Sequence, residues 1–329
     1  MIDFKSLQDL IIKNHSFLIT THVNPDADAI GSEIAFSKML NMLGKDSVII
    51  NHSETPYNLQ FLDPEKKIRK YNPQLHDNYL HSSDVLVALD FNKSDRMVSM
   101  QKAFLKSNQT KICIDHHQDP ESFVNYQFVD PDYAATGHIL YDFFKTTGII
   151  NLTKEIATPI YAAIMTDTGS FRFERTTAEL HRIIAELLDT GIDPTEIYNR
   201  LYDESRFSKI KLLGKSLNSL KLIANNEIGY MSITQQDFNE FDALESDTEN
   251  FVNFILSTAG VRLGMLFIEL KNGFKVSFRS KGKIPVNKLA GIFGGGGHIN
   301  ASGARFRDAQ MADMVPKILQ EAENFIKKY

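Results

Sequence analysis

The strongest constraint on the fold of this chain is a series of short apolar runs that each lead into histidine or aspartate. Three of them occupy residues 17–20, 85–89 and 111–114. Short apolar runs without polar alternation are typical of parallel strands buried on both faces. The first run is followed by the apolar periodicity of a helix over 30–43. We therefore predict an α/β fold whose first domain is built on a doubly wound, mostly parallel sheet.

The residues that follow these runs are imidazoles and carboxylates. The set comprises His22, Asp26, Asp28, Asp90, Asp115, His116 and His117. Because parallel strands carry their C-terminal ends to the same edge of a sheet, we expect the set to converge there. Each residue alone has a structural explanation, with Asp26 capping a turn, Asp28 capping the helix and His22 solvated. Three strand ends that all deliver ligand types suited to Mn²⁺, Zn²⁺ or Fe²⁺ favour a metal site.

A further acid, Asp167, follows a predicted helix over 153–165 and lies among small and hydroxyl residues. Phe171 and Phe173 come shortly after it. Aromatic rings beside a charged site can stack on a nucleobase. Core packing explains one of the two rings equally well, so both interpretations stay open.

Length and composition indicate an ordinary globular protein with more than one domain. The chain has 329 residues, of which 43% are hydrophobic and 23% charged, enough for two cores. No apolar run approaches the roughly 18 residues of a membrane span, and the N-terminus lacks the layout of a signal peptide. The single cysteine, Cys113, lies in a predicted strand and fits a reducing compartment. We expect a cytoplasmic protein without a membrane partner.

Charge is unevenly distributed along the chain. The net charge is −5, which argues against a protein that coats long duplex nucleic acid. Residues 262–307 nevertheless contain nine Lys or Arg and one acid, a net charge of +8 against −13 for the rest. A local cationic patch beside an acidic body suits a small anionic ligand.

The sequence predicts three regions. A first domain over 1–193 closes at Gly191 and Asp193-Pro194, which together form a helix stop signal. Residues 194–226 are predicted to be a helical linker. A smaller α/β domain over 227–329 is expected to contain a strand over 228–233, a hairpin turning at Asn272-Gly273, the glycine run 294–297 and a final helix over 315–328.

The order of these motifs resembles that of the DHH phosphoesterase superfamily. The matching residues are His22-x-x-x-Asp26-x-Asp28, Asp90, Asp115-His116-His117 and Asp167. The run Gly294–Gly297 followed by His298-x-x-Ala301-Ser302-Gly303 resembles the nucleotide-binding loop of the associated C-terminal domain. The resemblance spans residues 17 to about 306, and its four spaced motifs plus the glycine loop make it specific.

The resemblance implies a site with two divalent metal ions, Mn²⁺ first, with Mg²⁺ or Co²⁺ as alternatives. One ion would be held by His22, Asp26 and Asp90, and the other by Asp28, Asp90, His116 and Asp167. Asp115 would orient a histidine, His117 would face the phosphate, and Arg279 would be the cationic donor. The substrate's far end would contact Gly294, Gly295, Gly296, Gly297 and His298, with Ser280 and Asn300 predicted as further contacts.

Within the superfamily, the chain is most similar to the stand-alone oligoribonucleases that also act as pAp phosphatases. This resemblance implies hydrolysis of oligoribonucleotides of about two to five nucleotides and removal of the 3′-phosphate of adenosine 3′,5′-bisphosphate (pAp). The alternatives are a phosphodiesterase of cyclic di-AMP or its linear product pApA, an inorganic pyrophosphatase, and a nucleotide sensor without activity. The sequence does not fix the oligomeric state, and a homodimer stays open.

Overall fold

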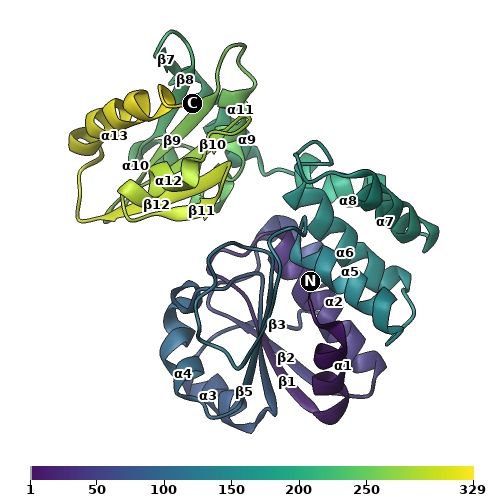
Figure 1. The fold of residues 1–329 in the computed structure, drawn as a ribbon. Coiled ribbons are helices and arrows are strands. Elements are labelled where there is room, and N and C mark those ends of the chain that lie inside the picture. Colours follow the sequence, from purple (N-terminus) through teal and green to yellow (C-terminus); the bar gives the residue numbers. More distant parts are fainter. Residues whose placement is uncertain (1) are drawn as a thin grey trace. The chain divides into compact units, whose positions relative to one another are not determined.

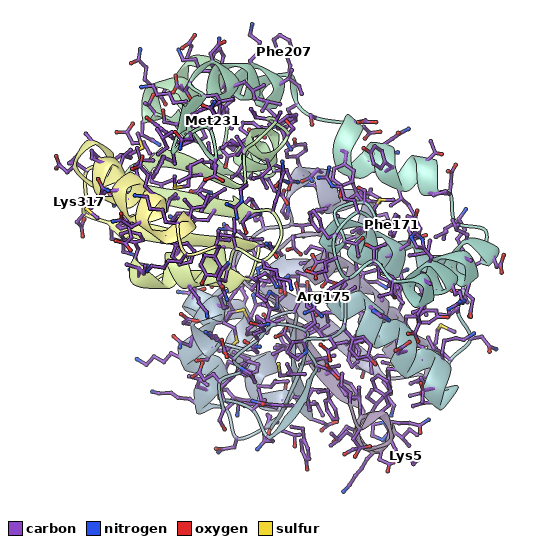
Figure 2. All side chains as sticks on the ribbon, turned by 45° about the horizontal axis from the view of Figure 1, so that its top comes forward. Lys5, Phe171, Arg175, Phe207, Met231 and Lys317 are labelled. Carbon is purple, nitrogen blue, oxygen red and sulfur yellow. The ribbon has the colours of Figure 1, made fainter. Side chains whose placement is uncertain are left out.

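The computed structural model describes residues 2–329, which form two compact units, Met1–Glu204 and Ser205–Tyr329 (Figure 1). Each unit has its own hydrophobic core. In the second unit Met231 is a buried residue of the sheet, whereas Phe207 is 78% exposed (Figure 2).

The first unit is organised around a parallel sheet. Its strands among the described residues are β1 (Ser16–Thr20), β2 (Asp46–Asn51), β3 (Ile68–Lys70), β4 (Val85–Leu89), β5 (Thr110–Asp115) and β6 (Tyr126–Val129). They follow the order β3-β2-β1-β4-β5-β6, and every neighbouring pair is parallel. This is the doubly wound arrangement, and it confirms the predicted fold class. The sequence did not predict β3 and β6, because these strands are short and mostly polar or exposed.

Helices cover both faces of this sheet. They are α1 (Phe4–Lys13), α2 (Ala27–Met42), η1 (Tyr57–Leu62), α3 (Pro73–Ser82), η2 (Ser94–Met100), α4 (Gln101–Lys106), α5 (Thr136–Thr147), α6 (Lys154–Asp167), α7 (Ala178–Asp189), α8 (Pro194–Tyr198) and η3 (Asn199–Asp203). Side chains alternate along each strand, so that Ile19 and Val87 face a core shared with α2, α5 and α6. Leu18 and Leu86 face the opposite core, with α3, α4 and η2.

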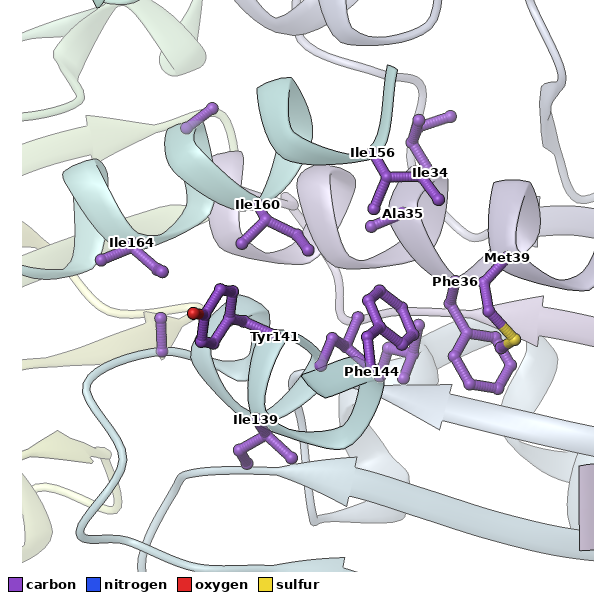
Figure 3. Packing of buried hydrophobic residues seen from close by; sticks show 14 of the residues in the cluster. Ile34, Ala35, Phe36, Met39, Ile139, Tyr141, Phe144, Ile156, Ile160 and Ile164 are labelled. Atoms are coloured by element: carbon purple, nitrogen blue, oxygen red, sulfur yellow. The ribbon is translucent and has the colours of Figure 1, made fainter. Parts of the chain in front are cut away.

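Helix α2 confirms the helix predicted over 30–43, and it is buried on almost all sides. The reason is its close packing against α6, visible in Figure 3. A Cβ atom at Gly31 would lie 2.4 Å from the carbonyl oxygen of Pro159, so only glycine permits this approach. Because α2 is the next element after β1, its burial fixes the turn between them, which carries His22 and Asp26.

The second unit contains a sheet in the order β11-β12-β10-β9-β8-β7. Its strands are β7 (Lys221–Ile223), β8 (Ile228–Ile233), β9 (Leu263–Leu270), β10 (Gly273–Ser280), β11 (Gly296–His298) and β12 (Ala301–Arg307). Its helices are α9 (Phe207–Asn218), α10 (Gln235–Phe241), η4 (Glu245–Thr248), α11 (Phe251–Leu256), α12 (Val286–Ile292) and α13 (Met311–Ile326). The pairing is antiparallel except between β8 and β9. Its core combines apolar residues of the strands with α12 and α13.

The segment 194–226, predicted as a helical linker, is divided between the two units. Helices α8 and η3 belong to the first unit, whereas α9 and β7 belong to the second. Residues 221–223 pair with β8 as a strand instead of continuing a helix. The hairpin of β9 and β10 turns at Lys271-Asn272, one residue earlier than predicted, because Gly273 already pairs with Leu270.

None of the helices among residues 2–329 combines the length and the apolar character that crossing a membrane requires.

One buried acid of the first core has no role in the predicted site. Glu33 of α2 is fully buried, and the Asn51 side-chain amide donates a hydrogen bond to its Oε2 at 2.8 Å. The Asn51 Oδ1 accepts a bond from the backbone N–H of Thr21. Burial raises the pKa of Glu33 from its ordinary 4.5 to about 8, and the bond from Asn51 only partly opposes this shift.

This shift makes stability depend on pH. Between about pH 4.5 and 8 the folded chain retains a proton on Glu33 that the unfolded chain has lost. The free energy of unfolding should therefore fall as pH rises through this range, by up to about 1.4 kcal/mol per pH unit from this group. Glu33→Gln should flatten that slope in denaturant unfolding measured from pH 5 to 8.5. An unchanged slope, equal to that of the exposed control Glu174→Gln, would contradict the assignment.

Candidate functional site

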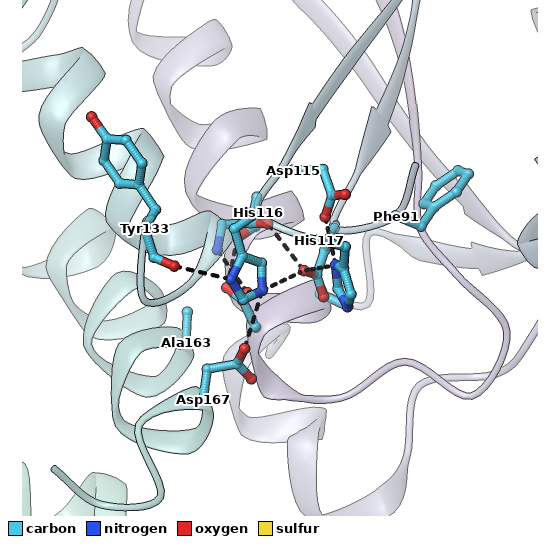
Figure 4. Close-up of polar contacts among 12 residues, drawn as sticks. Phe91, Asp115, His116, His117, Tyr133, Ala163 and Asp167 are labelled. Carbon is cyan, nitrogen blue, oxygen red and sulfur yellow. Dashed lines mark hydrogen bonds and ion pairs between the residues drawn. The ribbon is translucent and has the colours of Figure 1, made fainter. Parts of the chain in front are cut away.

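The predicted imidazoles and carboxylates of the first unit meet at the C-terminal edge of its sheet (Figure 4). His22 and Asp26 lie between β1 and α2, Asp90 follows β4, and Asp115 is the last residue of β5. Asp167 comes from a helix instead of a strand, since it is the last residue of α6. Three strand ends and one helix end thus supply one cluster, as the parallel topology requires.

Asp90 lies at the centre of the cluster and is almost fully buried. Its Oδ2 is 3.4 Å from Nε2 of His22, and its Oδ1 is 3.6 Å from Nε2 of His116. The backbone of Asp90 adopts φ 64°, a left-handed conformation that aspartate tolerates better than most residues. The two oxygens of one carboxylate therefore face two different histidines.

These contacts divide the cluster into two main groups of potential ligand atoms. His22, Asp26 and Asp90 form one group, and the other is formed by Asp28, His116 and Asp167. In each group the ligand atoms lie within 4.8 Å of one another. Distances of 3.1 Å from His116 Nε2 to Asp167 Oδ2 and 3.5 Å to Asp28 Oδ2 define the second group.

Backbone carbonyls orient both buried histidines. The Nδ1 atom of His22 lies 2.9 Å from the carbonyl oxygen of Val23, and Nδ1 of His116 lies 3.3 Å from that of Tyr133. In each ring this leaves Nε2 directed at the carboxylates. Asp26 also caps α2, since its Oδ1 accepts bonds from two backbone amides of the first turn. Asp26 therefore both caps α2 and belongs to the cluster.

His117 belongs to a separate pair at the edge of the cluster. Its Nδ1 lies 2.7 Å from Oδ1 of Asp115. Burial opposes ionisation of Asp115, but the hydrogen bond from His117 and the neighbouring histidine charges lower its pKa overall. An ionised Asp115 accepts the bond, so Nδ1 of His117 carries the proton and the orientation of the ring is fixed.

The cluster contains more buried carboxylates than the positive charges of the protein itself neutralise. Burial, together with Asp28 and the other nearby carboxylates, raises the pKa of Asp90 well above its ordinary value. Burial likewise raises the pKa of Asp167 to about 6. Burial opposes protonation of His116, but Asp167 and Asp28 outweigh it and raise its pKa to about 9. Within the described residues, Oδ2 of Asp115 is buried without a hydrogen-bond partner. This donor set of carboxylates and imidazoles fits divalent cations.

Sequence analysis missed the residues that hold Asp28. Its carboxylate accepts bonds from the backbone amides of Thr136 (2.7 Å) and Gly137 (2.9 Å) and from the hydroxyl of Ser32 (3.2 Å). In the sequence, Thr136-Gly137 predicts the start of a helix over 138–146, a common feature that indicates no partner for Asp28.

The predicted substrate contacts Arg279, Ser280, His298 and Asn300 lie in the second unit. Ser280 is buried and donates to the carbonyl of Ile284, while the amide of Asn300 donates to Ser280 Oγ and to the carbonyl of Gly282. These bonds fasten the end of β10 to the turn between β11 and β12. His298 is exposed at the end of β11.

The glycine run 294–297 forms part of a hairpin. Gly296 and Gly297 open β11, which pairs with β12. A Cβ atom at Gly295 would lie 2.2 Å from the carbonyl oxygen of Gly303, and one at Gly297, where φ is 135°, would lie 2.6 Å from that of Ala301. Glycine is therefore required for the close approach of the two strands.

The two aromatic residues after Asp167 differ in environment. Phe171 packs against the core of the first unit and contacts the rings of Tyr161 and His181. Phe173 is 48% exposed, and its ring covers Gly169. The core explanation therefore applies to Phe171.

Comparison with known proteins identifies both parts of the chain. Residues 16–164 match the DHH family N-terminal domain, and residues 227–328 match the DHHA1 domain. The chain is 33% identical to the bifunctional oligoribonuclease and PAP phosphatase NrnA of Thermus thermophilus, over 92% of this chain and 87% of the relative. Identity to the Bacillus subtilis protein of the same name is 27%, over 98% of this chain and 97% of the relative.

A solved structure shares the fold along almost the whole chain. It is the crystal structure of an exopolyphosphatase-related protein from Bacteroides fragilis, with a TM-score of 0.91 and 32% sequence identity. The match covers 98% of this chain and 95% of that one.

Crowding of carboxylates at the cluster predicts a trade-off between stability and cation binding. In the metal-free protein, Asp90→Asn removes one buried acid and keeps an oxygen for its neighbours, so we expect melting about 2–4 °C higher. Mn²⁺ should raise the melting temperature of the original protein more than that of Asp90→Asn. Differential scanning fluorimetry with EDTA or Mn²⁺ measures both effects. Equal Mn²⁺ shifts in Asp90→Asn and in the exposed control Asp189→Asn would contradict the prediction.

Proposed function

The chain belongs to the DHH phosphoesterase family, and we propose that it hydrolyses short oligoribonucleotides to 5′-mononucleotides and converts pAp to AMP. The observation that carries this proposal is the pair of ligand groups on either side of Asp90. A relative that shares a third of its residues over most of the chain is named for both activities. The buried Cys113 agrees with a cytoplasmic enzyme.

We assign two divalent cations to the cluster. His22, Asp26 and Asp90 would hold one, and Asp28, Asp90, His116 and Asp167 the other, with Asp90 shared between them. Mixed carboxylate and imidazole ligands suit Mn²⁺ first, with Mg²⁺ or Co²⁺ as alternatives. Two such cations, when bound, lower the pKa of a water and neutralise charge on phosphate oxygens.

The remaining residues of the first unit orient the phosphate. Asp115 accepts a hydrogen bond from Nδ1–H of His117 and orients the ring, whose opposite nitrogen would face the phosphate. In the second unit, Arg279 offers a planar fork that suits phosphate. His298 and the amides of the glycine run would bind the substrate's far end. The net charge of −5 also favours short ligands over long duplex nucleic acid.

The two activities are one chemical step. Release of a 5′-mononucleotide from an oligoribonucleotide breaks the bond between phosphorus and the 3′-oxygen of the neighbouring ribose. Removal of the 3′-phosphate of pAp breaks the same type of bond. In both reactions water supplies the new oxygen on phosphorus, and the 3′-oxygen leaves with a proton. A single site therefore accounts for both activities, and the substrates differ only in what lies beyond the phosphate.

A substrate panel tests the proposal. The pure protein with Mn²⁺ would be given a dinucleotide, a five-mer, a 24-mer, pAp, cyclic di-AMP, pApA and pyrophosphate. We expect fast release of 5′-mononucleotides from the dinucleotide and the five-mer, slow reaction with the 24-mer, and conversion of pAp to AMP. Asp90→Ala should remove all of these activities while circular dichroism shows a folded protein, because the shared carboxylate is lost.

The other outcomes identify the alternatives. Preference for cyclic di-AMP or pApA would replace the short-RNA assignment by second-messenger turnover at the same site. Turnover of pyrophosphate alone would mean a different substrate class. Nucleotide binding without any metal-dependent turnover would indicate a sensor, and full activity in Asp90→Ala would remove the site assignment itself.

A further inference from the structure

Thr136, which no sequence motif singled out, contacts both halves of the cluster. Its hydroxyl donates a hydrogen bond to Oδ1 of Asp90 at 3.0 Å. Its backbone N–H donates to Oδ2 of Asp28 at 2.7 Å. All three residues are almost fully buried, so these bonds do not compete with bulk solvent. One residue thus fixes the shared carboxylate and a carboxylate of the second group.

Packing behind Thr136 holds it in place. The next residue, Gly137, approaches α6 so closely that a Cβ atom there would lie 2.6 Å from the Cβ of Ala163. Figure 4 shows Ala163 on α6, one turn before Asp167. The start of α5 is therefore tied to the helix that supplies Asp167, and Thr136 has little freedom to follow a displaced carboxylate.

The contacts of Thr136 and its neighbours also determine which lone pairs of the Asp28 and Asp90 carboxylates remain available to a cation. A carboxylate offers about four acceptor sites. Three donors already contact Asp28, from Thr136, Gly137 and Ser32, which leaves roughly one site, on the side of His116. On Asp90 the Thr136 hydroxyl contacts Oδ1, the oxygen near His116, whereas Oδ2 lies near His22. The hydroxyl therefore acts on the side of Asp90 that belongs to the second group.

We propose that Thr136 is a positioning residue of the two-cation site, whose hydroxyl sets the orientation in which Asp90 serves both groups at once. This inference rests on the proposed function, because it concerns the same cations. Without the hydroxyl, Asp90 can rotate about its side-chain bonds, and the group of Asp28, His116 and Asp167 loses its share of that carboxylate. The group of His22, Asp26 and Oδ2 of Asp90 depends less on this bond, because the hydroxyl contacts Oδ1 and not the oxygen that faces His22.

Thr136→Val tests this directly, since valine keeps the shape and the backbone N–H and removes only the hydroxyl. Isothermal titration of metal-free protein with Mn²⁺ should show two sites in the original protein. We expect the variant to weaken one site by about 10- to 100-fold and to leave the other within about threefold, the range found for residues that orient metal ligands. Thr136→Ser, which keeps the hydroxyl, should restore the weakened site.

Kinetics provide a readout that a purely structural defect would not move. With pAp as substrate, Thr136→Val should need about 10- to 100-fold more Mn²⁺ for half-maximal rate and should recover most of its kcat at saturating Mn²⁺. KM for pAp should stay the same. Thr158→Val is the matched control, because it removes a hydroxyl that donates to the Lys154 carbonyl within α6.

The outcomes separate this inference from the proposed function. Two unchanged Mn²⁺ sites in Thr136→Val, or equal weakening of both sites, would overturn the role of Thr136. Absence of a second Mn²⁺ site in the original protein would overturn the proposed two-cation site instead. If Thr136→Val does not fold, Thr136→Ala against Thr136→Ser makes the same comparison, and failure of serine to bind more tightly than alanine overturns the inference.

Discussion

The candidate site of the first unit depends on one buried carboxylate, that of Asp90, which has histidines on both sides. A buried acid with several acidic neighbours is unfavourable in a protein alone, and the raised pKa of Asp90 reflects this. The surrounding fold nevertheless holds the Asp90 carboxylate in this position. The hydroxyl of Thr21 donates to the carbonyl of Leu89 and joins the ends of β1 and β4, and Asp90 itself turns with positive φ directly after β4.

Rigid packing behind the cluster keeps the crowded carboxylates close together. Helix α2 is buried on nearly all sides and approaches α6 at Gly31, so that the helices carrying Asp28 and Asp167 are fixed to one another. Helix α5 is fixed to α6 at Gly137. The carboxylates consequently cannot relax apart when no cation neutralises them. Preorganisation of this kind strengthens cation binding at the expense of stability without the cation.

The sequence predicted the sheet and the cluster for the same reason. Uninterrupted apolar runs indicate buried parallel strands, and parallel strands end at one edge, so the convergence of His22, Asp90 and Asp115 follows from general geometry. Contacts set by tertiary packing were not predictable. Thr136 reaches Asp28 across 108 positions of sequence, and a Thr-Gly pair at a helix start is common. Strand β7 was predicted as helix because three residues carry too little periodicity to identify a strand.

The most direct test of the shared carboxylate is anomalous diffraction at the manganese edge, from crystals of the full chain grown with Mn²⁺. The account predicts two peaks about 3.5–4 Å apart, one beside each oxygen of Asp90, with His22 and His116 on opposite sides. A single peak, or two peaks of which neither contacts Asp90, would contradict it.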